Sequence, residues 1–168
     1  LMNRKHLISD YIKIYEKLKT INPKIQFSSD FIIAYPGEDE KDFEATYDLI
    51  KNIKFINSFS FIFSPRPGTK ASTFKLIDEK ISLMRLKKIQ AKLFDNQISM
   101  NKSLENNEID VLVENKIDGD DKFFGRSEHM TSVIFNGSLH DVGKVIKVKI
   151  NKSNQNTLFG ENMSKSEL

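Results

Sequence analysis

The sequence predicts an α/β fold in which a parallel α/β layer is followed by a small antiparallel β-barrel of the OB-like kind. The first observation is that residues 1–69 read helix, strand, helix, strand, an order typical of a parallel layer. The second is a long helical stretch from residue 78 to about residue 106. The third is a series of five short strands after Asn107, separated by turn residues at the spacing of a small barrel.

The first helix and the first strand have separate signals. Residues 10–19 repeat apolar side chains at helical spacing, and Ser9 or Asp10 can cap the helix. Pro23 ends it, because proline disfavours helical geometry in the residue before it. Residues 25–35 then alternate apolar and polar side chains, which indicates a strand.

The second helix and the second strand repeat this order. Asp39 can cap a helix whose apolar stripe runs to Ile50, and residues 55–63 form an aromatic, apolar strand. Two strands cannot close a barrel or bury both faces of a sheet. We therefore expect the layer to be truncated from a larger α/β domain.

The long helix carries apolar side chains on one side and basic side chains on the other. It is expected to serve as a packing and linking helix, with its basic face either solvated or in contact with phosphate groups. The basic residues assigned to that face are Lys80, Arg85, Lys87, Lys88 and Lys92.

The barrel is predicted from short strands and the turns between them. The chain divides into a layer (1–76), a connecting helix (77–106), a barrel (107–162) and a polar tail (163–168). The expected strands are 109–113, 123–127, 132–135, 145–150 and 157–159, with turn signals at 118–120, 136–137 and 151–156.

Composition excludes several classes of protein. The chain has 168 residues, 26 basic and 23 acidic side chains, and enough hydrophobic residues, 39%, for a real core. No apolar run approaches the roughly 18–20 residues that span a bilayer, and no secretory signal opens the chain, so a cytoplasmic protein is expected. Cysteine is absent and the three histidines are scattered, so the sequence offers no metal site.

The candidate ligand-binding residues lie where the two strands end. Ligands of parallel sheets bind outside the carboxyl ends of the strands, and both strands here run into stiff loops, 35–38 and 65–69. Gly37 permits a close approach to the backbone, and Glu38 and Arg66 each present one charge. The alternative is that both loops are ordinary turns with a surface charge.

Asp30 lies inside an apolar strand, where an ionised group is costly unless it is paired. It either faces a polar barrel interior or points outwards.

In the barrel, the candidate nucleic-acid ligands are basic residues beside aromatic ones. Lys147 and Lys149 alternate with apolar residues and share one outer face, which Arg126 could join. Phenylalanines such as Phe124 could supply a stacking surface for bases. The alternative is a solvated face, because the barrel as a whole is slightly acidic.

Several of these segments together resemble one enzyme family. The segments MNRKH (2–6), SSDFI leading to YPGE (28–38) and FSFIFSPRPGT (59–69) are similar to those of the radical-SAM methylthiotransferases. The segments GRS (125–127) and SVIF (132–135) resemble the TRAM domain that ends these enzymes. The resemblance covers nearly the whole chain in family order. Ala34 stands where the family usually has glycine.

The resemblance implies a fold, a reaction and partners. The fold would be the carboxy-terminal βα units of a radical-SAM partial TIM-like barrel, followed by an OB-like TRAM barrel that binds tRNA. The reaction would add a methylthio group to C2 of N6-isopentenyladenosine beside the anticodon. The cofactors of the full-length enzyme would be S-adenosylmethionine and two 4Fe-4S clusters. Their ligands would lie in the missing amino-terminal half, so the cysteine-free chain alone is expected to be inactive.

The resemblance also implies roles for individual residues and leaves alternatives open. Arg66 would be catalytic and Asp30, Gly37 and Glu38 would bind the cofactor. Members of the family that act on threonylcarbamoyl-adenosine share the Arg66 loop, whereas the branch that acts on a ribosomal protein differs there. A free-standing, non-catalytic RNA-binding module is the remaining alternative. The RNA-binding residues would be Arg126, Lys147 and Lys149.

Overall fold

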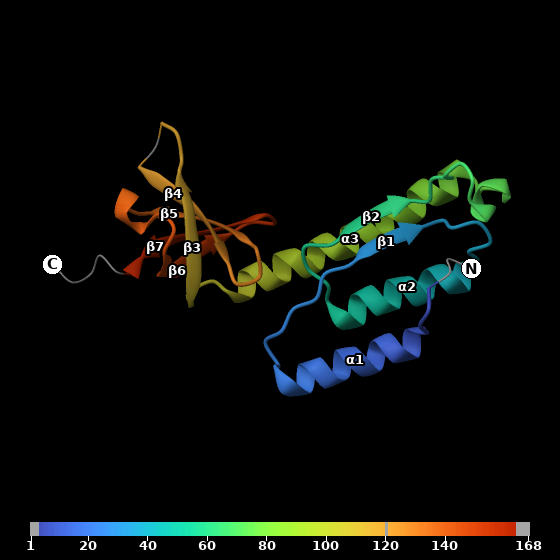
Figure 1. The fold of residues 1–168 in the computed structure, drawn as a ribbon, viewed down its shortest axis with the longest axis horizontal. Coiled ribbons are helices and arrows are strands. Elements are labelled where there is room, and N and C mark those ends of the chain that lie inside the picture. The colour runs from blue at the N-terminus through green and yellow to red at the C-terminus, as the bar shows by residue number, and fades with distance from the viewer. Residues whose placement is uncertain (1–3, 120, 164–168) are drawn as a thin grey trace.

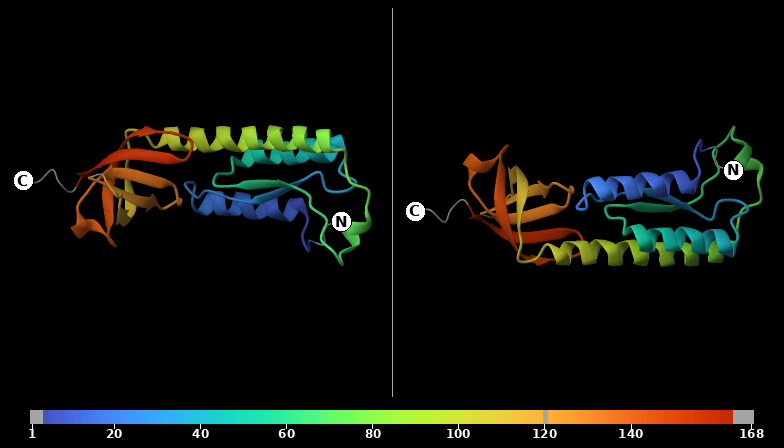
Figure 2. Two further views of the ribbon diagram at one scale, coloured as in Figure 1. Left: turned by 90° about the horizontal axis from the view of Figure 1, so that it is seen from above. Right: turned by 90° about the horizontal axis from the view of Figure 1, so that it is seen from below.

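The computed structural model describes residues 4–119 and 121–163 of the chain. One long helix, α3 (Glu79–Ser103), runs along the α/β unit and leads into a closed β-barrel at its carboxyl end (Figures 1 and 2). In that part of the chain, no helix combines the length and the apolar character needed to cross a membrane. The sequence predictions that concern Met2, Asn3, Asp120 and the tail from residue 164 onwards lie outside the described residues.

The α/β unit has the predicted element order. It contains α1 (Ile8–Ile21), β1 (Asp30–Ile33), α2 (Glu40–Ile53) and β2 (Phe59–Ile62), and a short 3-10 helix (Lys70–Thr73) precedes α3. The strands β1 and β2 pair in parallel, which confirms the predicted parallel layer. Both strands are shorter than the apolar segments predicted, because ladder pairing extends over only four residues of each.

Capping residues set where the helices begin. The Asp39 carboxylate accepts a hydrogen bond from the Asp42 N–H at 2.8 Å, which confirms the predicted cap of α2. Asp78 caps α3 in the same way. In α1 the prediction is corrected, because the capping position is Leu7. Asp10 lies in the first turn and accepts a hydrogen bond from the Leu7 N–H at 3.0 Å.

The core of the unit lies between one face of the sheet and the helices. Phe31 and Ile33 of β1 pack against α2 and α3, and tyrosines of α1 cover the side of this cluster. The opposite face of the sheet is open. In the part of the chain that the structure describes, its side chains are exposed, and they are Asp30, Ile32, Phe59 and Phe61.

The barrel contains the five strands that the sequence predicts. They are β3 (Glu108–Lys116), β4 (Lys122–Ser127), β5 (Ser132–Asn136), β6 (Val145–Ser153) and β7 (Thr157–Asn162), and a short 3-10 helix (Leu139–Asp141) precedes β6. Their order around the closed barrel is β3-β4-β5-β7-β6.

One feature of the predicted barrel is wrong: its strands are not all antiparallel. β5 and β7 pair in parallel, with Val133 opposite Leu158. The reason is topological, because strand directions cannot alternate all the way around a closed ring of five strands. At least one neighbouring pair must therefore run in the same direction.

Inside the barrel, apolar side chains from all five strands form a second core around Val111, Val133 and Val148. Gly125 is required where β3 and β4 approach each other closely. A Cβ at this position would lie 2.4 Å from the Leu112 carbonyl oxygen and 2.7 Å from Val111 Cγ1. The glycine of the GRS segment is thus explained by packing inside the barrel.

Candidate functional site

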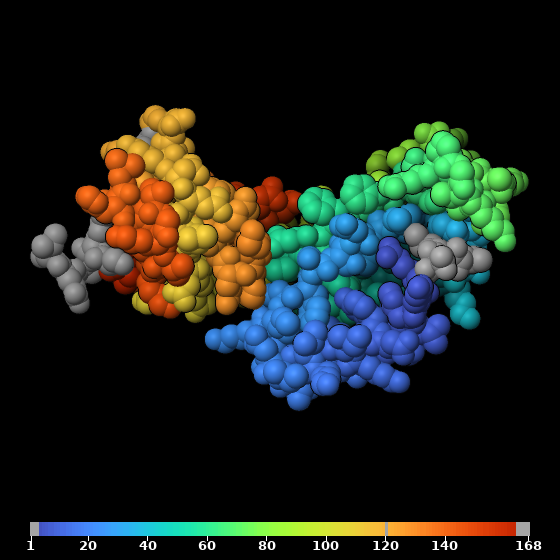
Figure 3. Space-filling model, viewed as in Figure 1, coloured from blue at the N-terminus to red at the C-terminus, as the bar shows by residue number. Residues whose placement is uncertain are grey.

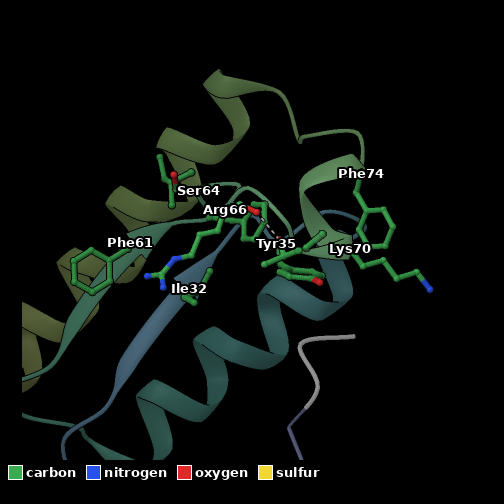
Figure 4. A pocket seen from close by; sticks show the side chains of 11 residues that line it. Ile32, Tyr35, Phe61, Ser64, Arg66, Lys70 and Phe74 are labelled. Atoms are coloured by element: carbon green, nitrogen blue, oxygen red, sulfur yellow. Dashed lines mark hydrogen bonds between the residues drawn. The ribbon is translucent and has the colours of Figure 1, made fainter.

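A cavity of about 1000 Å³ opens at the carboxyl ends of β1 and β2. Its walls include the open sheet face at Ile32 and Phe61, the aromatic ring of Tyr35, and the loop that contains Arg66. Figure 4 shows the Arg66 side chain extending across the sheet towards Ile32 and Phe61. Lys70 also borders the cavity, but its ammonium group points away from the sheet in this view.

The loop after β2 holds the backbone of Arg66 in place. The Thr69 hydroxyl donates to the Arg66 carbonyl oxygen at 2.8 Å, and the Thr69 N–H reaches the same oxygen at 3.2 Å. Prolines on both sides of Arg66 further restrict the loop. Within residues 4–119 and 121–163, no hydrogen bond or ion pair engages the guanidinium. An unpaired cation on a restrained loop backbone therefore faces a cavity that could hold a carboxylate, a phosphate or a base.

Glu38 has a different position from the one that the sequence suggested. Its carboxylate turns into the protein, where Oε2 accepts from the Ala34 N–H at 3.1 Å and Oε1 accepts from Arg85 at 2.9 Å. Burial raises the pKa of Glu38, while the Ala34 N–H and Arg85 act in the opposite direction. Glu38 therefore braces its own loop and does not line the cavity.

Arg85 is the residue that sequence reasoning misplaced. It was assigned to the solvated basic face of the long helix, but it is only 5% exposed. Its two terminal nitrogens donate to Glu38 and to Glu40, each at 2.9 Å, and its Nε has no hydrogen-bond partner among the residues that the structure describes. Helical spacing could have shown this, since Arg85 lies four residues before Ile89 and eight before Leu93, both of which are buried.

Neither Gly37 nor Asp30 lines the cavity that Arg66 borders. Gly37 has a φ of +93°, a conformation that favours glycine, and a Cβ there would meet nothing within 4 Å. Asp30 lies at the amino end of β1, on the open face, where its side chain is exposed. The structure thus places Gly37 beside the carboxyl end of β1 and Asp30 at the other end.

The two lysines of the barrel are matched by carboxylates. Lys147 lies 2.8 Å from Asp110, and the hydrogen bond between them, more than their charge attraction, raises the pKa of Lys147. Lys149 stands between Glu108 on β3 and Glu161 on β7 in the strand register. This outer face therefore alternates positive and negative charges and is not a basic patch.

Arg126 lies on the other side of β3 from the lysines, so the structure does not bring the three predicted RNA-binding residues together. Its Nε lies 3.1 Å from Glu114, its Nη1 donates to the Met130 carbonyl oxygen, and its guanidinium stacks over Phe124. The predicted pairing of a basic residue with an aromatic ring is found here.

A second hollow, of about 300 Å³, lies where the barrel meets the α/β unit. Figure 3 shows the contact between the β4–β5 region, in orange, and the green-blue α/β unit. Arg126 and Met130 of the barrel line this hollow together with Phe59 of β2 and Phe94 of α3. Sequence reasoning missed it because its walls come from segments that are far apart in the chain.

A chain of amide hydrogen bonds holds these walls in position. Asn57 donates through Nδ2 to the His129 carbonyl oxygen at 2.7 Å, and its N–H donates to Gln97 Oε1 at 2.7 Å. Gln97 Nε2 donates to Asn101 Oδ1, and Asn101 Nδ2 donates to the carbonyl oxygens of Asn154 and Gln155. We call Asn57, Gln97 and Asn101 the amide ladder.

The residues of this chain do not fit an iron–sulfur cluster. The sequence contains no cysteine, and the described residues contain no group of three histidine or acidic side chains that could hold a metal ion. Any cluster chemistry would need ligands from outside the 168 residues.

Comparisons with known proteins agree with the barrel and extend to the whole chain. Residues 102–162 match the model of the TRAM domain. The chain is 62% identical over 161 residues to a Pelagibacter ubique protein named tRNA-2-methylthio-N(6)-dimethylallyladenosine synthase, covering 96% of this chain and 36% of that protein. Proteins of the same name from Clostridium novyi and Rickettsia akari are 40% and 41% identical, each over 95% of this chain and 36% of their own length. The chain therefore spans about a third of the length of these curated relatives.

Proposed function

We propose that this homologue of the tRNA-2-methylthio-N(6)-dimethylallyladenosine synthases is the carboxy-terminal part of such an enzyme. Residues 1–76 would be the last βα units of a radical-SAM barrel, 77–106 its connecting helix, 107–162 its tRNA-binding TRAM barrel, and 163–168 a tail. The complete cytoplasmic enzyme would add a methylthio group to C2 of N6-isopentenyladenosine beside the anticodon. The observation that carries the proposal is the 62% identity across 96% of the chain.

The open face of the sheet supports a larger barrel. Ile32, Phe59 and Phe61 expose apolar side chains there, an arrangement that is unfavourable in water. In the complete polypeptide, upstream strands would extend the sheet and turn this face into the interior of the barrel. The part of the enzyme that binds both 4Fe-4S clusters would lie in the same upstream region, because this chain has no cysteine.

The chain would contribute binding and positioning groups. Arg66 would present its guanidinium to an anionic or planar part of S-adenosylmethionine or of the target nucleotide. The backbone at Gly37 is open to a close approach by the cofactor. Glu38 would act indirectly, because its buried carboxylate holds the conformation of that loop through the Ala34 N–H and Arg85. Asp30 would bind the cofactor from the amino end of β1, at the other end of the open sheet face.

The names of the relatives favour isopentenyl-adenosine, rather than threonylcarbamoyl-adenosine or a ribosomal protein, as the substrate of the complete enzyme.

The experiment is to express the complete polypeptide with Arg66→Ala in a strain that lacks its own methylthiotransferase. We expect methylthiolated adenosine to disappear from tRNA hydrolysates while the protein level stays unchanged. Lys75→Ala is the matched control, since Lys75 is exposed in the same connection between β2 and α3 but does not line the cavity. Unchanged modification in the Arg66→Ala strain would remove Arg66 from the site.

A further inference from the structure

We propose that the hollow between the barrel and the α/β unit binds one unstacked base of a single-stranded RNA segment, with Phe94 as the surface on which the base stacks. The inference rests on the proposed tRNA-binding function and adds the place of contact. It also moves that contact away from the lysines of β6.

The position of the hollow on the barrel is the first argument. The order β3-β4-β5-β7-β6 corresponds to strands 1-2-3-5-4 of an OB-like barrel. Such barrels bind oligonucleotides on strands 2 and 3 and on the loop between strands 4 and 5. Here these are β4, β5 and the turn between β6 and β7, and the hollow is lined by Arg126, Ser132 and Asn156 from those three segments.

The chemistry of the walls is the second argument. Phe94 is 46% exposed although it lies in a concave site, and Met130 and Phe59 present further apolar surface. Bases of single-stranded RNA stack on such aromatic rings, whatever their sequence. Gln155 and Asn156 line the same hollow, and side-chain amides can hydrogen-bond to base edges.

Charge pairing occurs at both places, because Arg126 lies 3.1 Å from Glu114 and Lys147 lies 2.8 Å from Asp110. The difference is geometric: the Arg126 guanidinium also donates to the Met130 carbonyl oxygen and lies over the ring of Phe124. On β6, Lys149 stands between Glu108 and Glu161 in the strand register. A phosphate that approached Lys149 would therefore be repelled as well as attracted.

The amide ladder provides the third argument, because it makes the hollow a formed site. Asn57, two residues before β2, ties the α/β unit to the β4–β5 connection, and Asn101 ties α3 to the turn between β6 and β7. The α/β wall and the barrel wall are thus held in one arrangement before a ligand arrives, which lowers the entropic cost of binding.

The test measures binding of a fluorescein-labelled, unmodified tRNA transcript to the 168-residue chain by anisotropy. We expect Phe94→Ala to weaken binding at least about fivefold, the lower end of the loss that alanine substitution of a stacking residue causes. Phe94→Tyr, which keeps the ring, should bind like the parent. Ile98→Ala is the matched control, because Ile98 lies one turn further along α3 with a similar exposure, 44%, and is not in the hollow.

The outcomes separate the two proposals. If the parent binds tRNA and Phe94→Ala binds equally well, the base site is overturned while the proposed tRNA-binding function stands. A parent chain that does not bind tRNA overturns both. The double variant Lys147→Ala, Lys149→Ala should change the affinity for tRNA less than Phe94→Ala does. A larger loss in the double variant would show that tRNA binds the β6 face and would overturn the base site. Circular dichroism spectra of all variants should match that of the parent.

Discussion

Arg85 in α3 donates to Glu38 Oε1 at 2.9 Å and to the Glu38 carbonyl oxygen at 3.1 Å, and so joins the connecting helix to the loop after β1. The same Glu38 carboxylate accepts from the N–H of Ala34, a residue with a φ of +60°. Two residues that lie 47 positions apart therefore fix the loop that carries Gly37. The connecting helix is part of the candidate site, not only a link to the barrel.

Replacing Arg85 by methionine should destabilise the α/β unit strongly. The substitution keeps much of the side-chain volume but leaves the Glu38 carboxylate buried without its cation, a change that costs about 3–5 kcal/mol. Urea denaturation monitored by tyrosine fluorescence measures the change. Lys88→Met, one turn along α3, is the control, because the Lys88–Glu44 pair is exposed and its removal should cost far less. Equal losses of unfolding free energy in Arg85→Met and Lys88→Met would contradict the conclusion that Arg85 neutralises a buried carboxylate.

Glu38 should make stability depend on pH with a defined sign. Its pKa in the folded protein is raised above the ordinary value of 4.5. Between that value and the raised pKa, the folded state binds more protons than the unfolded state, so this group makes the free energy of unfolding fall as the pH rises. We expect the parent to lose stability relative to Glu38→Gln as the pH is raised from 4.5. If the parent instead gains stability relative to Glu38→Gln as the pH rises, the pKa of Glu38 in the folded protein is lowered.

Gly125 should not tolerate a side chain. An alanine Cβ would lie 2.4 Å from the Leu112 carbonyl oxygen, so β3 and β4 would have to separate, at a cost of at least about 1–3 kcal/mol. Gly119→Ala is the comparison, since nothing lies within 4 Å of a Cβ there and only the positive φ adds a cost, about 1–2 kcal/mol. Thermal unfolding should show the larger loss for Gly125→Ala. The opposite ranking would mean that β3 and β4 separate easily.

The amide ladder should determine how the barrel sits on the α/β unit. Gln97→Leu leaves the Asn57 N–H and the Asn101 Oδ1 without their hydrogen-bond partner, and each such loss costs about 1–3 kcal/mol. Residual dipolar couplings should then show the barrel reoriented or mobile relative to the α/β unit. Gln90→Leu, a half-buried position on the same helix without a ladder contact, should leave the couplings unchanged. If the Gln97→Leu couplings are also unchanged, contacts other than the amide ladder determine the orientation of the barrel.

Local patterns predicted the elements that depend on local chemistry. The Asp39 cap, the parallel pair and the five barrel strands follow from capping, helical spacing and alternation, and the structure contains them. The parallel β5–β7 pair was missed, although an odd number of strands in a closed barrel requires one.

The candidate site was harder to predict, because its geometry depends on contacts between distant residues. Glu38 turns inwards only because Arg85 meets it from α3. The neutral charge balance around Lys147 depends on the register that brings Asp110 opposite to it. The hollow beside Phe94 requires a contact between Asn57 and His129, 72 positions apart. No local pattern in the sequence carries that information.

We propose that this chain is the tRNA-binding, carboxy-terminal part of a methylthiotransferase whose cluster ligands lie upstream, and this proposal is the one to test first. The most direct measurement is mass spectrometry of tRNA nucleosides from a strain without its own enzyme, expressing either the complete polypeptide or the 168 residues alone. The account predicts methylthiolated isopentenyl-adenosine with the complete polypeptide and none with the chain alone. Modification by the chain alone, or its absence with the complete polypeptide, would contradict it.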